Sequence, residues 1–159
     1  MLKKSLRQQG DFDKLIEQGA GHGSALSRLK GVDMKRISSG GEFEAKVGYC
    51  RAVVAGGFVH VAGTVGQGED VVAQCRDALR IIEGALKEAR SDLAHVVRVT
   101  YMLPDRTEFE ACWPALSEAF GGNPPAATMI ECGLIDPKYR IEIEVTAVPR
   151  SDIVDDRRV

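Results

Sequence analysis

The fold of this chain is decided between residues 58 and 103, where a strand pattern, a helix pattern and a second strand pattern follow one another. Residues 58–62 read FVHVA, residues 69–90 read EDVVAQCRDALRIIEGALKEAR, and residues 96–103 read VVRVTYML. In the middle stretch the apolar residues fall at positions 72, 75, 79, 82, 86 and 89, the spacing of one face of an α-helix. The flanking stretches are rich in β-branched residues, and Gly63 and Pro104 end them. The sequence therefore predicts a strand, a long amphipathic helix and a second strand.

Similar patterns continue on both sides of this segment. Toward the N-terminus, residues 45–55 are predicted to be extended, and Gly56-Gly57 to form the turn into the next strand. A second helix is predicted with Asp105 as its N-cap, and Pro114 either kinks it or marks its first turn. Its predicted buried face consists of Phe109, Cys112, Trp113, Leu116 and Phe120. Strands over residues 126–132 and 139–148 complete the order β-β-α-β-α-β-β, which is an α+β domain.

Two helices can cover only one face of such a sheet. In the last predicted strand the residues alternate: Tyr139, Ile141, Ile143, Val145 and Ala147 point one way, and Arg140, Glu142, Glu144 and Thr146 point the other. The strand over residues 96–103, however, carries apolar residues on both faces. We therefore expect another subunit to cover the second face of the sheet.

The composition is that of one soluble domain. The chain has 159 residues, of which 44% are hydrophobic and 28% charged. The net charge of -2 argues against a strongly basic nucleic-acid clamp, although residues 1–36 carry a local charge of +4. We predict an N-terminal extension over residues 1–33, as short helices or a mobile arm, a domain over residues 34–150 and a polar tail over residues 151–159. Translation from Met34 is an alternative for the start of the protein.

The cysteines and the apolar runs bear on metals and location. The four cysteines, Cys50, Cys75, Cys112 and Cys132, lack the spacing of a zinc site, so no metal site is expected. Cys75 and Cys112 fall on apolar helix stripes, which predicts reduced thiols in the core. The chain begins without a secretory signal and has no run of about 18 apolar residues that would cross a membrane. A cytoplasmic protein is the expectation.

Two motifs allow a structural or a functional interpretation. The glycine-rich stretch at residues 63–68, GTVGQG, precedes a helix but lacks the order of a phosphate-binding loop, so a β–α turn is predicted. The alternating charges of residues 140–144, RIEIE, are either a solvated strand face or carboxylates that line a pocket. No Ser lies in a GxSxG nucleophile motif.

Four stretches, in their order and spacing around the two helices, resemble the RidA/YjgF family of reactive intermediate deaminases. They are Glu44–Tyr49, Val59–Thr64, Pro125–Thr128 and Ile141–Glu144. The resemblance implies a chorismate-mutase-like fold, three subunits that close their sheets around a common axis, and small-molecule clefts at the subunit interfaces. Members that act as deaminases add water to a 2-imino acid, formed from its enamine, and release ammonia and the 2-keto acid. The resemblance implies no metal and no organic cofactor.

The resemblance also assigns roles by position. Tyr49 and the backbone near Gly63 match substrate-binding elements of the family cleft. Glu142 matches the glutamate that positions or activates water, which is the work of a general base. Glu142 is therefore the predicted catalytic residue.

One element of the family cleft is missing. Deaminases of the family bind the substrate carboxylate with an arginine in a Pro-Ala-Arg-Ser/Thr motif, but here Ala127 occupies the arginine position. Met129, on the same predicted strand, also shapes the cleft, and Ala62 replaces a serine common in the family. Arg140 and Arg51 are the nearest candidates to replace the missing guanidinium.

These observations lead to three functional hypotheses for a homotrimer. The first is an atypical hydrolase or deaminase of imines or enamines that acts poorly on 2-imino acids. The second is a module that binds a metabolite without turning it over. The third is action on RNA, because some relatives are described as ribonucleases or translation inhibitors. The net charge and the lack of interleaved aromatic and basic residues argue against nucleic-acid binding.

Overall fold

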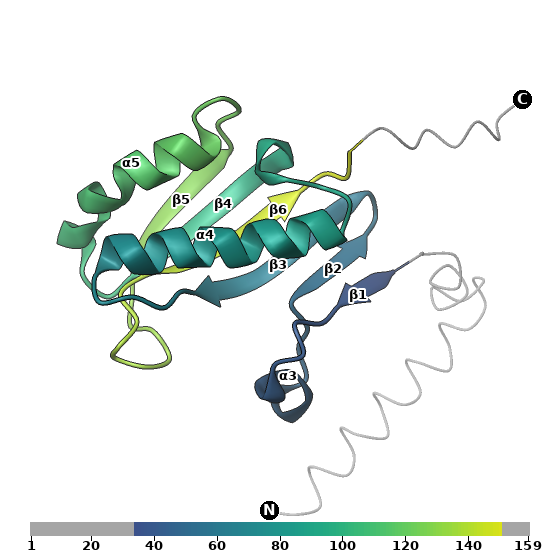
Figure 1. The fold of residues 1–159 in the computed structure, drawn as a ribbon, viewed down its shortest axis with the longest axis horizontal. Coiled ribbons are helices and arrows are strands. Elements are labelled where there is room, and N and C mark those ends of the chain that lie inside the picture. The colour runs from purple at the N-terminus through teal and green to yellow at the C-terminus, as the bar shows by residue number, and fades with distance from the viewer. Residues whose placement is uncertain (1–33, 151–159) are drawn as a thin grey trace, which may run out of the picture. The chain divides into compact units, whose positions relative to one another are not determined.

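The domain is a six-stranded sheet with two long helices on one side (Figure 1). The structure is a computed structural model, and it describes residues 34–150. The strands are β1 (Lys35–Ile37), β2 (Ala52–Ala55), β3 (Phe58–Val65), β4 (Val96–Leu103), β5 (Ala126–Glu131) and β6 (Glu142–Ala147). Their spatial order is β1-β2-β3-β6-β4-β5, in which β4 and β5 are parallel and all other neighbours antiparallel. The predicted α+β class is confirmed, and the sheet is mixed.

Helix α4 (Val71–Glu88) follows the sequence pattern closely. The Asp70 carboxylate caps it by accepting a hydrogen bond of 2.8 Å from the backbone N–H of Ala73. Cys75, Ile82 and Leu86 are fully buried against the sheet. The predicted apolar stripe is therefore the face by which α4 covers the sheet.

Helix α5 (Phe109–Phe120) differs in one respect from the prediction. Asp105 caps a short 3-10 turn, η4 (Arg106–Glu108), that leads into the helix, and Pro114 lies inside the helix. The predicted burial of Trp113 is wrong, since this residue is 54% exposed. The face that packs on the core consists of Cys112, Ala115, Leu116 and Phe120. The buried face extends from Cys112 and Leu116 toward Ala115, which leaves Trp113 at its exposed edge.

The segment before β2 is helical where an extended chain was expected. Helix α3 (Glu42–Val47) includes residues 45–47, and only Ala52–Ala55 form a strand. Its C-cap, Gly48, adopts a left-handed φ of 84° and donates a hydrogen bond to the Glu44 carbonyl. The Glu44 carboxylate accepts hydrogen bonds from Ser38 and Ser39, which ties the helix to the preceding loop. These local bonds outweigh the strand preference of the segment.

The alternation predicted for the last strand is confirmed, although β6 begins at Glu142. Ile141, Ile143, Val145 and Ala147 are buried under the helices. The face without helices, called the open face here, carries Glu142, Glu144 and Thr146. The same strand therefore contributes apolar residues to the core and polar residues to the open face.

Strand β3 extends through Gly63 to Val65, beyond its predicted end. The register with β6 shifts between Val61 and Thr64, so that Ala62 and Gly63 form a β-bulge. This bulge lies in the interior of the sheet, next to β6.

The remaining expectations divide into those that the structure describes and those that it does not. Cys75 and Cys112 are buried free thiols, as predicted. Among residues 34–150, no helix is long and apolar enough to cross a bilayer, and no three His, Cys, Asp or Glu side chains gather around a possible metal position. The predictions for residues 1–33 and 151–159 lie outside the described residues.

Candidate functional site

The β3 bulge brings two predicted site residues together. Glu142 pairs with Val65 in the sheet and points to the open face. Its Oε1 atom lies so close to the Cα of Gly63 that a Cβ at position 63 would collide with it. A side chain at position 63 would therefore displace the Glu142 carboxylate from its place on the bulge.

The electrostatic surroundings of Glu142 make it a stronger base than an ordinary carboxylate. Partial burial is the main cause that raises its pKa above 4.5, and the nearby carboxylate of Glu144 raises it further. The positive charge of Arg51 opposes both effects and favours the ionised form. Glu142 thus combines a raised proton affinity with a nearby cation, a combination that suits a general base.

Arg51 lies on the bulge, immediately before β2. Its Nη1 atom donates hydrogen bonds to Thr64 Oγ1, at 2.8 Å, and to the Gly63 carbonyl, at 3.4 Å. The Thr64 hydroxyl in turn donates to the Ala62 carbonyl at 2.7 Å. Arg51 therefore contacts Gly63 of the bulge and Thr64, which follows the bulge.

Tyr49 lies between α3 and Arg51. Its backbone N–H donates a hydrogen bond to the Glu44 carbonyl at 3.1 Å, so its position depends on the end of α3. Its side chain is 41% exposed and makes no hydrogen bond within residues 34–150. The structure thus places Tyr49 two residues from Arg51, without a direct bond to Glu142.

Ala127 and Met129 lie on β5, at the edge of the sheet. They pair with Val99 and Tyr101, so both point to the side of the sheet that carries the helices. Ala127 borders a hollow of about 230 Å³ that is otherwise lined by Tyr101, Leu116, Ser117, Phe120, Gly121, Pro124 and Pro125. Strand β4 separates β5 from β6, a distance of roughly 10 Å at the usual strand spacing. Within one chain, Ala127 and Glu142 therefore lie on different strands and opposite faces.

Arg140 is committed to another contact. Its Nε donates to Glu108 Oε2 at 2.9 Å, and Nη2 forms an ion pair with the other carboxylate oxygen of Glu108. Its backbone N–H donates to Gln74 Oε1 at 2.8 Å. Of the two arginines named as replacements, only Arg51 adjoins Gly63 and Glu142.

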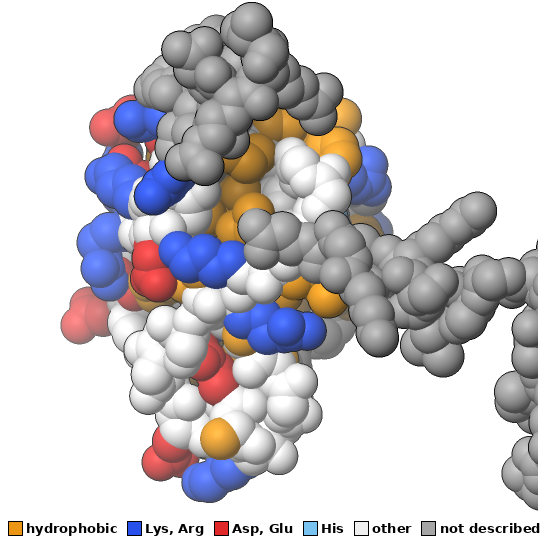
Figure 2. All heavy atoms as spheres, turned by 90° about the vertical axis from the view of Figure 1, so that its right-hand side faces the viewer, with side chains coloured by type: hydrophobic (Ala, Val, Ile, Leu, Met, Phe, Trp, Pro, Cys, Tyr) orange, Lys and Arg blue, Asp and Glu red, His pale blue; other side chains and the backbone are white. Residues whose placement is uncertain are grey.

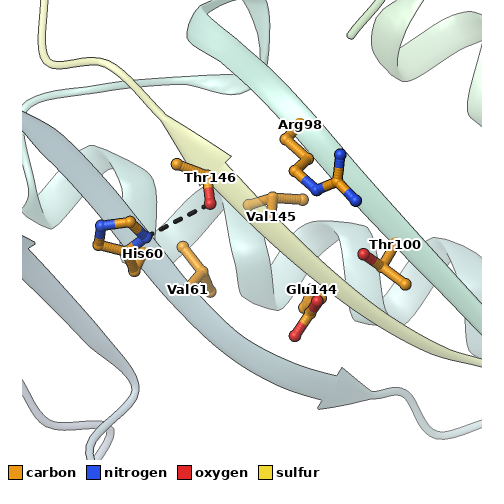
Figure 3. Close-up of a pocket in the computed structure, with 7 residues that line it drawn as sticks. All are labelled: His60, Val61, Arg98, Thr100, Glu144, Val145 and Thr146. Carbon is orange, nitrogen blue, oxygen red and sulfur yellow. Dashed lines mark hydrogen bonds between the residues drawn. The ribbon is translucent and has the colours of Figure 1, made fainter. Parts of the chain in front are cut away.

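A second hollow, of about 230 Å³, lies on the open face (Figure 3). His60 of β3, Arg98 and Thr100 of β4, and Glu144 and Thr146 of β6 surround it, and Thr146 Oγ1 is 3.4 Å from His60 Nδ1. The hollow contains none of the predicted site residues. It shows that the open face carries both signs of charge together with hydroxyl groups.

The charges of residues 34–150 show no excess of basic side chains. Residues 34–150 contain 13 Lys and Arg and 16 Asp and Glu, a balance of -3. Figure 2 shows one side of the molecule, on which basic and acidic side chains lie among one another. This mixture gives no support to a phosphate-tracking surface on the visible side.

Comparison with known proteins defines the family. A family model described as Endoribonuclease L-PSP matches residues 40–149. This chain belongs to the RidA/YjgF family. The predicted resemblance is thereby confirmed. Several relatives of this RidA/YjgF protein have solved structures or described activities.

Two solved structures illustrate the relationship. Rv2704 of Mycobacterium tuberculosis, described as a member of the YjgF/YER057c/UK114 family, is 44% identical to this RidA/YjgF protein. The match has a TM-score of 0.71 and covers 73% of this chain and 99% of that one. NMB1025 of Neisseria meningitidis, described as a member of the YjgF family, is 32% identical with a TM-score of 0.63, over 74% of this chain and 96% of the other.

One relative carries an activity in its name. The 2-iminobutanoate/2-iminopropanoate deaminase of Rattus norvegicus is 27% identical over 124 residues, which are 72% of this chain and 90% of the relative. The similarity therefore extends over nearly the whole length of a named deaminase.

Proposed function

We propose that this RidA/YjgF protein is a homotrimeric hydrolase of small imines or enamines whose substrates lack a carboxylate, with Glu142 as the catalytic base. The observation that carries the proposal is the Glu142 carboxylate resting on the Gly63 bulge, with its pKa raised by burial. Tyr49 and Gly63 are the proposed substrate-binding residues on this side of the cleft. Ala127 and Met129 are the proposed lining on the other side.

Hydrolysis of an imine needs one general base and involves no electron transfer. Water adds to the imine carbon while Glu142 accepts a proton from it, and the C=N bond becomes a single bond. Glu142 then returns this proton to the nitrogen, which gives a neutral carbinolamine. In the second stage Glu142 takes the proton of the carbinol hydroxyl and passes it to the amino nitrogen, while the C=O bond forms and the C–N bond breaks, so the products are a carbonyl compound and ammonia. A base with a pKa above the ordinary carboxyl value serves these proton transfers better than an ordinary carboxylate.

The absence of a cation at Ala127 supports a substrate without a carboxylate. A guanidinium there would form two charge-assisted hydrogen bonds, each contributing roughly 1.5–3 kcal/mol. Each 1.36 kcal/mol lost from transition-state binding costs about tenfold in rate. We therefore expect hydrolysis of 2-imino acids to be slower by on the order of a hundred- to ten-thousand-fold than with such a contact.

The positions of the site residues support an assembly. Glu142 and Ala127 occupy opposite faces of one chain, so only neighbouring copies can join them in one cleft. The open face also exposes Phe58 and Ile130, each more than two-fifths accessible, beside its charged groups. Such a face favours a second copy as its cover. Light scattering is expected to give about three times 17.2 kDa, and a stable monomer at micromolar concentration contradicts the assembly.

The activity is tested by ammonia release from a panel of imines and enamines with and without an α-carboxylate. We expect turnover of carboxylate-free substrates, and a loss of about 10²–10⁴-fold in Glu142→Gln with the trimer intact. Glu83→Gln, the same change on α4, where Glu83 pairs with Lys87, is expected to keep turnover. Full activity of Glu142→Gln shows that another residue is the base.

Failure on every substrate distinguishes the binding hypothesis from the catalytic one. A metabolite that binds without turnover, present at about 100 times its Kd, adds about 2.7 kcal/mol to the stability. A thermal shift with a metabolite library, in the absence of ammonia release, therefore identifies a binding module.

A further inference from the structure

Arg51 makes an unusual set of contacts on the Ala62–Gly63 bulge. One nitrogen, Nη1, holds both the Thr64 hydroxyl and the Gly63 carbonyl. The Nε atom is buried and has no hydrogen-bond partner within residues 34–150. A buried unpaired donor lowers stability, so hydrogen bonding alone does not account for an arginine at this position.

Two carboxylates lie within electrostatic reach of the Arg51 guanidinium. Glu44 is buried, 7% exposed, and its oxygens accept hydrogen bonds from Ser38 Oγ and from the N–H and Oγ of Ser39. Glu142 has no such donors among the described residues, and the positive charge of Arg51 acts on it. Of the two carboxylates, Glu142 is therefore the one with oxygens still free to bind a water or a substrate proton.

The geometry also links Arg51 to the position of the Glu142 carboxylate. This carboxylate rests on the Cα of Gly63, and the Gly63 carbonyl is held by Arg51. A change in the bulge moves the surface that supports Glu142. A misplacement of about 1 Å can cost about a hundredfold in rate.

We propose that Arg51 is the positioning residue of this site: it fixes the bulge that supports Glu142 and supplies the positive charge beside the Glu142 carboxylate. The proposal rests on the proposed function for its kinetic consequences, but its electrostatic part concerns Glu142 alone. Arg51 acts through Glu142 and the bulge, and it needs no contact with the reacting atoms.

The test compares the titration of the Glu142 carboxyl by carbon NMR in four proteins, with Glu142→Gln used to assign the signal. Arg51→Gln removes the charge and keeps one donor, whereas Arg51→Lys keeps the charge with a single nitrogen. The matched control is Arg80→Gln, since Arg80 is an exposed arginine of α4 that pairs with Asp77. The fourth protein is the wild type.

Arg51→Gln is expected to raise the pKa of Glu142, and Arg51→Lys to bring it back toward the wild-type value. In the kinetics of Arg51→Gln, the acid limb of the kcat/KM profile moves to higher pH. The loss is expected to be about tenfold to a hundredfold on the acid limb of the profile and smaller at pH values above it. Arg80→Gln is expected to leave the titration and the profile unchanged.

An unchanged or lowered Glu142 pKa in Arg51→Gln overturns the proposal, even if imines are hydrolysed. Conversely, the expected titration without turnover of any imine supports the role of Arg51 and contradicts the proposed function. If Arg51→Gln does not fold, Thr64→Val keeps the cation and removes its main acceptor. Faster amide exchange at Gly63 and Thr64 in that variant supports the bulge contact, and unchanged exchange contradicts it.

Discussion

Alternating residues of the same strands form the two faces of the sheet, and the two faces differ in what their side chains contribute. On the covered face, Ile143 and Val145 of β6 are buried in the core between the sheet and the helices. On the open face, Glu142 is partly buried beside the carboxylate of Glu144. Both conditions disfavour its ionised form and raise its pKa. The covered face stabilises the fold, whereas the open face carries groups whose placement stability alone does not explain. The odd-numbered residues of β6 therefore stabilise the fold, whereas its even-numbered residues are available for chemistry.

The largest expected effect tests the covered face. Ile143→Ala removes a side chain with no exposed surface and leaves a cavity, so it is expected to lower the free energy of unfolding by about 2–5 kcal/mol. Thr146→Ala, on the open face of the same strand, is expected to change it by only about 0.5 kcal/mol. Urea unfolding of both variants gives the comparison. Equal losses contradict the division of β6 into a stabilising and a chemical face.

The second prediction tests whether the edge strand β5 belongs to the cleft. Ala127→Arg is expected to increase kcat/KM toward 2-imino acids by about tenfold or more, because it supplies the missing carboxylate contact. The matched control is Ala111→Arg, since Ala111 is an exposed alanine of α5 and lies outside the sheet. Ammonia release measures both variants.

The same gain in Ala111→Arg shows that added positive charge, and not position, is responsible. No gain in Ala127→Arg, with the trimer intact and Glu142 active, separates β5 from the cleft.

Local patterns predicted the parts of the fold that depend on local order. The apolar stripe of α4 and the alternation of β6 are predicted correctly because the first follows the period of a helix and the second that of a strand. Helix α3 was missed because Ser38 and Ser39 stabilise it through Glu44, a side-chain contact that periodicity does not record. The burial of Trp113 is predicted wrongly because this residue falls at the edge of the helix face that packs on the core, and periodicity alone does not show where that face ends.

The candidate site was predicted only in part, for a related reason. The resemblance named Gly63 and Glu142, but their contact depends on a bulge that shifts the register of two strands distant in sequence. Arg51 was named only as a replacement cation, and its bonds to that bulge require the folded sheet. The separation of Ala127 from Glu142 follows from strand order, which the sequence pattern alone does not give.

The third prediction concerns the other arginine considered for the cleft. Arg140 pairs with Glu108 at a partly exposed position, so Arg140→Met is expected to cost about 0–1 kcal/mol of stability. Because the pair lies apart from the Gly63 bulge, imine turnover is expected to remain at the wild-type level. A large loss of turnover, with normal stability, transfers the role of the cation from Arg51 to Arg140.

The smallest expected effect compares two glutamates whose pKa values move in opposite directions. Hydrogen bonds from Ser38 and then Ser39 lower the pKa of Glu44, so its contribution to stability is present at neutral pH and is lost as the pH falls through that lowered value. Burial raises the pKa of Glu142, so its ionisation above that value lowers the stability of the folded protein. Relative to wild type, Glu44→Gln is therefore expected to lower the Tm near pH 8, and Glu142→Gln to raise it.

Both differences are expected to shrink toward about pH 4 and below, as the wild-type carboxyl groups become protonated, with the Glu142 difference fading first as the pH falls. Thermal unfolding near pH 4, 6 and 8 measures them. A Glu142→Gln variant that loses both turnover and stability at pH 8 indicates a structural carboxylate that fits its surroundings. A variant that loses turnover but gains stability has the opposite meaning: the folded protein holds Glu142 ionised at a cost, as a residue kept for chemistry requires.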